Sequence, residues 1–419
     1  MPLVWDVIII GGGASGLMAA GRAAELGARV LLLEKMGRVG IKLSLTGKGR
    51  CNLTNGGDLR TFIESYRHNG KFLHNAFSRF FNDEVIHFFH SRGLPTIEER
   101  GRRIFPRSNR APDVVRVLRE YALAYGVKII PHSPVREILA REGRVTGVQT
   151  EKTVWEASRV ILATGGASYS QTGSSGDGYP MARRLGHTIQ PIHPSLVPLE
   201  VEGSDVRELQ GLALKNVRAT LFTSGRKGEE EFGEMLFTHF GISGPIILTL
   251  SGAVVAEIEK GKVEIAIDFK PALSEEQLDR RLLREWQAHP RQQVINILPN
   301  LLPHRLVPVF LKRAGISPVL RGSEIRGEER KRLLHLLQDW RLTVKGPRPL
   351  DEAIVTAGGI SVKEIHPATM ESRLIKGLFF CGEVIDVDGK TGGYNLQAAF
   401  STAWVAGEAA AQAVGKIIQ

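Results

Sequence analysis

Two short apolar runs, separated by a glycine-rich segment, dominate the first 35 residues. Residues 6–10 are rich in β-branched side chains, as in a buried parallel strand, and residues 28–33 form a second run of this kind. Between them, Gly11, Gly13 and Gly16 precede a helical pattern that stops at Gly27. Glycines at this spacing allow a tight turn, close approach of a pyrophosphate and close packing of helix on strand. The pattern predicts a strand, a turn, a helix and a second strand.

An acidic residue follows the second predicted strand. Glu34 lies 18 residues after Gly16, where a carboxylate accepts hydrogen bonds from the ribose hydroxyls of an adenosine. A 2′-phosphate would be repelled there, so NADP is disfavoured at this position. The strand, the three glycines, the helix and the acid in this order predict a dinucleotide-binding fold.

Further along the chain, strand and helix patterns alternate. A helical, basic pattern covers residues 66–119, and alternating β sequence follows from 127 to 156. A buried strand at 160–162 then ends in small residues. Short strands with glycine turns fill the centre of the chain, and amphipathic helices begin at Ser274 and near residue 325. The predicted division is residues 1–191 for a first part of the nucleotide-binding domain, 192–272 for an inserted β-rich domain, 273–345 for an inserted helical cap and 346–419 for the second part.

Composition narrows the class of protein. The chain has 419 residues, of which 42% are hydrophobic and 24% are charged, as in an ordinary globular protein. Two cysteines exclude a disulfide framework and a four-cysteine zinc site, so we expect a reduced, cytoplasmic protein without a metal centre. No apolar run approaches the roughly 18 residues of a membrane span, and no basic-then-apolar leader precedes the first strand.

The net charge of +11 is concentrated in two segments. Residues 92–119 hold eight Arg against three acids, and residues 305–348 hold eleven Lys and Arg against four acids, which gives local charges of +5 and +7. Such segments are either solvated surface arginines or contacts for a polyanion such as RNA. The composition leaves both interpretations open.

Seven sequence runs carry a resemblance that spans nearly the whole chain in order. They read IIIGGGASG, TGKGRCNLTN, GRRIFP, ILATGG, LFTHFGISGP, VTAGGI and GEVIDVDGKTGGYNLQ. With them the chain resembles the BaiN/YhiN-like, aminoacetone-oxidase-type FAD-dependent oxidoreductases. The resemblance implies FAD as cofactor and an α/β fold. In that fold, a Rossmann-like FAD-binding domain of the glutathione-reductase type is interrupted by a β-rich domain and a helical cap.

The same runs give the predicted cofactor-binding residues. In the second flavin signature, Glu383 stands where most such flavoproteins have Asp, and the positive end of the last helix would face the flavin. The full set is Gly11, Gly13, Ala14, Ser15, Gly16, Glu34, Lys35, Lys42, Thr46, Gly49, Arg50, Cys51, Asn52, Val135, Ala163, Thr164, Gly165, Gly382, Glu383, Asp386, Gly392, Gly393, Tyr394, Asn395 and Leu396.

The resemblance leaves the substrate open. Members of the family have been linked with reduction of a ribosomal RNA uridine, with reduction of conjugated double bonds and with oxidation of small amines. We favour the RNA reductase; the alternatives are a small-molecule ene-reductase or amine oxidase, and a flavin-containing binding protein without turnover. Reduction of uracil needs an acid to protonate C5, and Cys51 and His239 are the predicted catalytic residues, with a structural role as the alternative for each. The sequence has no second strand–GxGxxG–helix unit, which leaves two alternatives open: NAD(P)H reaches the substrate side as an external electron donor, or oxygen reoxidises the flavin.

Overall fold

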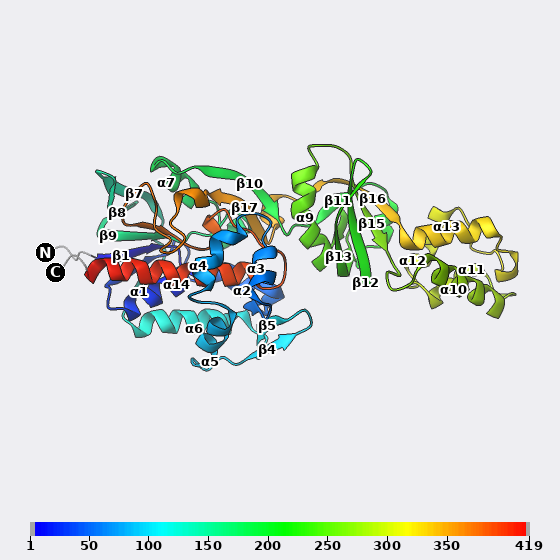
Figure 1. Cartoon of the computed structure of the whole chain (residues 1–419), viewed down its shortest axis with the longest axis horizontal. Helices are drawn as coiled ribbons and strands as arrows, with labels where there is room; N and C mark the ends of the chain where they lie inside the picture. The colour runs from blue at the N-terminus through cyan, green and yellow to red at the C-terminus, as the bar shows by residue number, and fades with distance from the viewer. Residues whose placement is uncertain (1–4, 416–419) are drawn as a thin grey trace. The chain divides into compact units, whose positions relative to one another are not determined.

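The computed structural model describes residues 5–415, which belong to two compact units (Figure 1). The first unit combines Met1–Pro194 with Leu350–Gln419, and the second is Ser195–Pro349. The chain therefore leaves the first unit once and returns to it once. The division into four segments made from the sequence stays a prediction, and its outermost residues, 1–4 and 416–419, lie outside the described part.

The first unit is built around a seven-stranded sheet with a parallel centre. Strand β1 (Trp5–Ile10) pairs in parallel with β2 (Val30–Leu33) and with β9 (Val154–Leu162). Strand β6 (Lys128–Ile130) extends the sheet beyond β2, and β18 (Leu378–Phe380) pairs in parallel with β9. Strands β7 (Val135–Arg141) and β8 (Arg144–Thr150) add an antiparallel extension to β9. The predicted Rossmann-type α/β fold is confirmed.

Three helices contribute most to the core around this sheet: α1 (Ala14–Glu25), α6 (Ala111–Ala124) and α14 (Tyr394–Gly415). Figure 1 shows α14 running alongside α1. Their backbones approach so closely that a Cβ at Gly407 would lie 2.5 Å from the Ala19 carbonyl oxygen. Small residues on both helices therefore bring the last helix of the chain against the first.

The remaining elements of the first unit include two small sheets. Strands β3 (Thr54–Asn55), β5 (Arg103–Pro106) and β4 (Thr96–Glu99) form an antiparallel sheet, and β10 (Ile189–Ser195) pairs with β17 (Val355–Ile360). The helical pattern read over residues 66–119 is wrong at β4 and β5, because Ile104 and Phe105 are buried by strand pairing and Gly101 (φ +77°) makes the turn. The helices are α2 (Ile41–Gly49), α3 (Leu59–Glu64), α4 (His74–Phe77), α5 (Asn82–His90) and α7 (Gly178–Arg184).

The second unit contains a closed six-stranded barrel. Around the barrel the strands follow in the order β11 (Leu199–Val201), β14 (Gly241–Ser243), β13 (Arg226–Phe237), β12 (Ala213–Thr223), β15 (Val263–Asp268) and β16 (Trp340–Pro347). Its helices are α8 (Asp205–Glu208), α9 (Pro245–Glu257), α10 (Glu275–Ala288), α11 (Val294–Ile297), α12 (Leu306–Ala314) and α13 (Gly327–Gln338).

Two local predictions can be compared with these helices. The capping box at the start of α10 is confirmed, because Ser274 accepts the Gln277 N–H and the Gln277 side chain accepts the Ser274 N–H. The helix read over residues 325–342 is too long, because Trp340 already pairs with Ile267 of β15. None of the helices within residues 5–415 combines the length and hydropathy that a bilayer crossing requires.

Candidate cofactor site

The glycine turn adopts the geometry that its sequence predicts. Gly11 has a φ of +101°, and a Cβ there would lie 2.6 Å from the Ala163 carbonyl oxygen. A Cβ at Gly16 would overlap the Gly11 carbonyl oxygen, so only glycine lets α1 start this close to β1. Beside Gly13, in contrast, a Cβ would meet no atom within 4 Å. The turn is closed on the protein side and open where a pyrophosphate would approach the first turn of α1.

The Glu34 carboxylate organises the backbone around this turn. It is buried, and it accepts hydrogen bonds of 2.7 Å from the N–H groups of Gly12 and Met36. The Glu34 carbonyl oxygen accepts a third from the N–H of Ser133, in the loop that leads to Val135 at the start of β7. A carboxylate oxygen has more than one lone pair, so Glu34 keeps acceptor capacity for ribose hydroxyls.

Several polar atoms next to the predicted cofactor segments are buried without a partner. They are Asn52 Oδ1, Thr164 Oγ1 and the Tyr179 hydroxyl, all in the first unit. Buried polar groups normally have partners, and a nucleotide carries hydroxyl, amide and phosphate groups that supply them. Together with the open side of Gly13, these atoms fit a bound dinucleotide.

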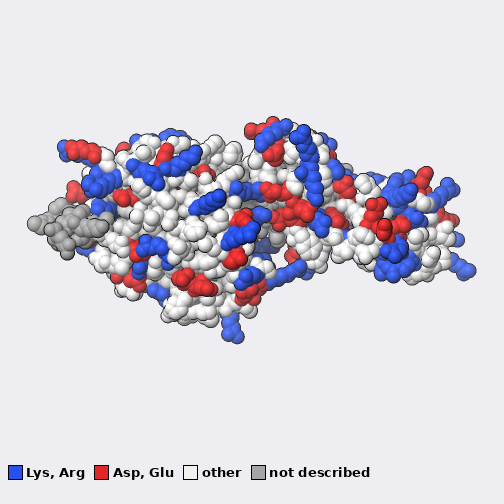
Figure 2. Space-filling model, viewed as in Figure 1, with Lys and Arg blue, Asp and Glu red and all other residues white. Residues whose placement is uncertain are grey.

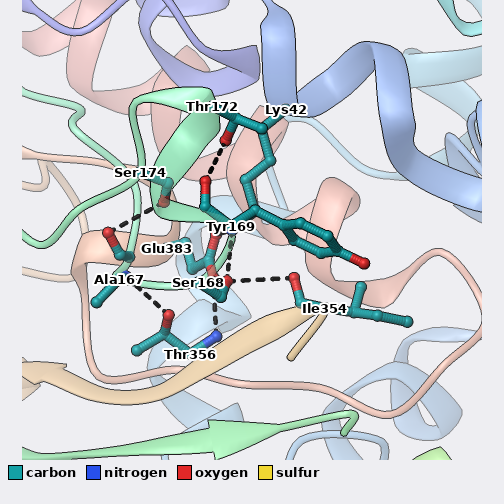
Figure 3. Close-up of polar contacts among 10 residues, drawn as sticks. Lys42, Ala167, Ser168, Tyr169, Thr172, Ser174, Ile354, Thr356 and Glu383 are labelled. Atoms are coloured by element: carbon teal, nitrogen blue, oxygen red, sulfur yellow. Dashed lines mark hydrogen bonds and ion pairs between the residues drawn. The ribbon is translucent and has the colours of Figure 1, made fainter. Parts of the chain in front are cut away.

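A lysine–glutamate pair joins the α2 segment to the second flavin signature (Figure 3). Lys42 Nζ donates to Glu383 Oε2 at 2.7 Å and to Ser168 Oγ at 2.8 Å. Glu383 Oε1 accepts the Thr356 N–H at 2.8 Å, and Thr356 Oγ1 accepts the Ala167 N–H at 2.8 Å. Two predicted residues, Lys42 and Glu383, are therefore brought together by the fold.

Ser168 and Thr356 are site residues that the sequence reasoning missed. Both are buried, and both lie inside quoted runs or directly after them: Thr356 in VTAGGI and Ser168 two residues after ILATGG. Their distance in sequence from Lys42 hides the contact, although the small polar residues after the buried strand were a signal. In Figure 3, Ala167 and Ser168 of the loop after β9, Thr356 at the start of β17 and Glu383 of the segment after β18 meet at this network.

The last residues of α2 and the loop that follows it contain unusual backbone conformations. Gly47, Lys48, Gly49 and Cys51 all have positive φ, between +58° and +83°. The Cys51 N–H donates to the Thr46 carbonyl oxygen at 3.0 Å, which closes the loop. The Cys51 side chain is fully buried, and this burial raises its pKa to about 12. The thiol is protonated at neutral pH.

Two predicted basic residues are engaged by acids of the first unit. Lys35 forms an ion pair with Asp177. The Arg50 guanidinium pairs with Glu99 of β4, donates to Asn109 and lies 4.2 Å from the centre of the Phe105 ring. Arg50 thereby links the loop after α2 to the small β3–β5–β4 sheet.

The C-terminal predicted residues lie around the start of α14. Gly382 has a φ of +77°, and its N–H donates to Thr402 within the helix. Asn395 exchanges two hydrogen bonds of 2.8 Å with the Gly389 backbone and so closes the loop before the helix. Asp386 accepts from Asn69 at 2.9 Å, and burial raises the pKa of its carboxyl group.

The other predicted cofactor residues lie in the first unit, whereas the predicted catalytic residue His239 lies in the second unit. Ala14, Ser15 and Leu396 lie in the first turns of α1 and α14, and Ala163 and Gly165 follow β9. Gly392, Gly393 and Tyr394 form the junction into α14. His239 is exposed in the second unit, where its ring meets Phe240 edge-on, and its catalytic role stays a prediction. Among the described residues, no three His, Cys, Asp or Glu side chains gather as metal ligands.

Comparison with known proteins decides the family. The model of the HI0933-like protein Rossmann domain matches residues 5–409. The chain belongs to the HI0933-like family. The expected resemblance is confirmed, and the chain is an FAD-dependent oxidoreductase.

Full-length relatives of this HI0933-like protein carry two kinds of name. The chain is 35% identical to the 3-dehydro-bile acid delta(4,6)-reductase of Clostridium scindens, over 96% of this chain and 98% of that protein. It is 32% identical to the ribosomal RNA dihydrouridine synthase of Escherichia coli K12, over 96% of each chain. It is 31% identical to the synthase of that name in Haemophilus influenzae, over 95% and 96% of the two chains.

Solved structures share the fold. The 3-ketosteroid delta1-dehydrogenase of Sterolibacterium denitrificans, in complex with 1,4-androstadiene-3,17-dione, superposes with a TM-score of 0.57 at 14% identity, over 98% of this chain and all of that one. The 3-ketosteroid-delta4-(5alpha)-dehydrogenase of Rhodococcus jostii RHA1 gives a TM-score of 0.51 at 16% identity, over 98% of each chain. At these identities the likeness describes the fold alone.

Proposed function

We propose that this protein reduces a carbon–carbon double bond conjugated to a carbonyl group, and that the bond is C5=C6 of a uridine in ribosomal RNA. The names of both kinds of full-length relative describe reductions of carbon–carbon double bonds. Dihydrouridine is uridine with two hydrogens added across a bond conjugated to the C4 carbonyl. The reaction class is therefore common to both names, and only the size and charge of the substrate differ.

The distribution of charge between the two units supports the RNA substrate. The first unit has 32 Lys and Arg against 24 Asp and Glu, a net charge of +8. The second has 23 against 20, a net charge of +3. The excess positive charge thus lies mainly on the unit that holds the cofactor residues, and a positive surface raises the local concentration of a polyanion.

Exposed arginines near the β3–β5–β4 sheet are the observation that carries this proposal. Arg102 lies in the β4–β5 turn, Arg107 and Arg110 lie between β5 and α6, and Arg116 and Arg119 lie on α6. All five side chains are exposed. A small apolar substrate needs no such surface, whereas the phosphates of RNA bind to it.

The reduction requires a hydride at C6 and a proton at C5. FAD, when bound and reduced, supplies the hydride. Cys51 Sγ holds a proton in the loop after α2, and its raised pKa, caused by burial, keeps that proton on sulfur through the physiological range. We assign the proton donation to Cys51, with His239 as the alternative donor. NAD(P)H is the proposed external electron donor, and the cytoplasm, where ribosomal RNA is found, is the proposed location.

Comparison of ribosomal RNA nucleosides tests the proposal. RNA from cells with and without the gene is digested to nucleosides, and dihydrouridine is quantified by mass spectrometry. We expect the deletion to lose dihydrouridine from ribosomal RNA and a plasmid copy to restore it. An unchanged dihydrouridine content would refute the RNA substrate.

A small conjugated ketone is the second candidate, since the bile acid reductase shows the higher identity of the two kinds of relative, 35%. Its test is anaerobic reoxidation of the reduced enzyme by a 3-oxo-4,6-diene steroid. Fast reoxidation by the steroid, without any by RNA, would favour this candidate. Fast reoxidation by oxygen with release of peroxide would instead favour an amine oxidase.

A further inference from the structure

The Asn55 side chain joins two parts of the first unit that are far apart in sequence. Its Nδ2 donates to the Gly101 carbonyl oxygen in the β4–β5 turn at 2.9 Å and to the Gly392 carbonyl oxygen before α14 at 3.1 Å. Its Oδ1 accepts the Gly57 N–H at 2.9 Å. The residue is 3% exposed, and Asn82 Nδ2 donates to its backbone oxygen at 2.9 Å. Both amide donors and the amide oxygen are therefore used.

The neighbouring residue of β3 makes a second connection to α14. Thr54 Oγ1 donates to Gln397 Oε1 at 2.5 Å, and Gln397 Nε2 donates to Ser401 Oγ at 2.9 Å and to the Phe80 carbonyl oxygen at 3.2 Å. Thr54, Gln397 and Ser401 are all buried. A Cβ at Gly393 would overlap the Thr54 carbonyl, so glycine there permits β3 to lie directly against the helix start.

The other side of β3 pairs with β5 of the β4–β5 hairpin. We call this hairpin the arginine hairpin, because its turn carries the exposed Arg102. Thr54 and Asn55 pair with Ile104 and Arg103 of β5, and the Gly56 N–H donates to the Arg102 carbonyl oxygen at 2.7 Å. The backbone of the exposed Arg102 is thus fixed through β3 to the first turn of α14. Predicted cofactor residues Gly392 and Gly393 directly precede that helix.

We propose that Asn55 is a positioning residue, which holds the arginine hairpin at a fixed place relative to the start of α14. The inference rests on the proposed RNA reductase function. Phosphates bound by the hairpin arginines place the target uridine, and Asn55 fixes that placement relative to the start of α14. Loss of the Asn55 hydrogen bonds to Gly101 and Gly392 therefore impairs the chemical step more than RNA binding, because the arginines themselves remain.

The experiment compares Asn55→Asp with Arg102→Gln. Aspartate keeps the shape and an oxygen for Gly57 but removes both donors and places a carboxylate against two carbonyl oxygens. Dithionite-reduced holoenzyme is mixed anaerobically with an unmodified ribosomal RNA transcript. Dihydrouridine formed in a single turnover is measured at saturating RNA, and the RNA dissociation constant is measured separately by filter binding.

We expect Asn55→Asp to lower the saturating rate on the order of 10- to 100-fold, as for a misplaced substrate, with the RNA dissociation constant within about twofold of wild type. Arg102→Gln should instead weaken RNA binding and make the salt slope smaller by about one, because it removes one phosphate contact. The control for added charge is Asn75→Asp, at an exposed position of α4, which should change neither value.

The outcomes separate the two proposals. If Asn55→Asp turns over at the wild-type rate, or loses RNA affinity in proportion to its rate, the positioning role is wrong while the RNA reductase stands. If the wild-type enzyme forms no dihydrouridine, the proposed function fails and the positioning role fails with it. If Asn55→Asp is isolated without FAD, Asn55→Ser replaces it, because serine removes the amide donors to Gly101 and Gly392 without adding a charge. A selective loss of the saturating rate again supports the positioning role, and a wild-type rate refutes it.

Discussion

Replacing Lys42 by methionine tests whether the Lys42–Glu383 pair stabilises the first unit. The side chains are 22% and 21% exposed, and their charged atoms lie 2.7 Å apart. Exposed ion pairs contribute about 0.2–1 kcal/mol, whereas removal of one partner from a fully buried pair costs about 3–5 kcal/mol. For a pair between these limits, we expect Lys42→Met to lower the free energy of unfolding by about 1–3 kcal/mol.

A double-mutant cycle with Glu383→Gln isolates the pairwise part of this loss. Glutamine retains an oxygen for the Thr356 N–H, so the cycle mainly removes the charge interaction. We expect a coupling energy of about 1–2 kcal/mol from urea unfolding of the FAD-free proteins. Hydrogen exchange measured in peptides containing β2, α2 and β18 reports the unfolding of the first unit, so that unfolding of the second unit does not enter the comparison.

The matched control is Lys71→Met, at an exposed position of the first unit. It removes the same charge and should leave the unfolding free energy within about 0.5 kcal/mol of wild type. Additive effects of Lys42→Met and Glu383→Gln within about 0.5 kcal/mol would refute the reasoning. The pair would then be a contact without energetic consequence.

Three further predictions follow from single residues. Gly16→Ala should yield protein without FAD, because its Cβ would overlap a backbone carbonyl oxygen; the ratio of flavin to protein absorbance measures this, and Gly327→Ala, where a Cβ meets nothing, is the control. Cys51→Ala should keep FAD but lose turnover, and the wild-type rate should show no loss from thiol ionisation between pH 7 and 9, because burial raises the pKa of the thiol to about 12; normal turnover of the variant would contradict the proton-donor role. Burial lowers the pKa of His187 below its ordinary 6.5, so the unfolded chain binds this proton more readily and the first unit should lose stability as the pH falls below 6.5. Urea midpoints at pH 5 and 7 should differ less in His187→Gln, and an equal difference in both proteins would exclude His187 as the cause.

The glycine turn could be predicted because its physics is local. Gly11 and Gly16 are required by atoms within six residues or by the adjoining strand, so the spacing alone carries the information. The conformation of the end of α2 and of the loop after it could be predicted only in part. Gly47 and Gly49 predicted that the chain runs close to the cofactor. The positive φ of Lys48 and Cys51 could not be predicted, because it arises where the loop closes on Thr46 and neither residue type favours this conformation.

The polar network at the cofactor site could not be predicted in the same way. Lys42 meets Glu383 across 341 positions of sequence, and Thr54 meets Gln397 across 343. Such pairs form only after the last helix packs against the first and β18 joins the sheet. Their contribution to stability therefore depends on tertiary structure and not on local sequence. The sequence supplied the members of each pair in separate motifs, and the fold supplied the partnership.

The local net charge of a sequence segment can overestimate the positive charge that is free to attract a polyanion, because the fold pairs some of its cations with acids. Residues 305–348 have a local charge of +7, yet some of their eleven cations pair with acids elsewhere in the second unit: Arg313 with Asp205, Lys312 with Glu208, Arg330 with Asp279 and Arg348 with Glu200. The face in Figure 2 accordingly shows acidic and basic side chains interspersed on this unit. Because the second unit as a whole has a net charge of +3 and the first has +8, a polyanion is attracted more strongly by the unit that holds the cofactor residues. The segment with the larger local charge is therefore the weaker candidate for RNA, and the exposed arginines around β5 and α6 are the stronger one.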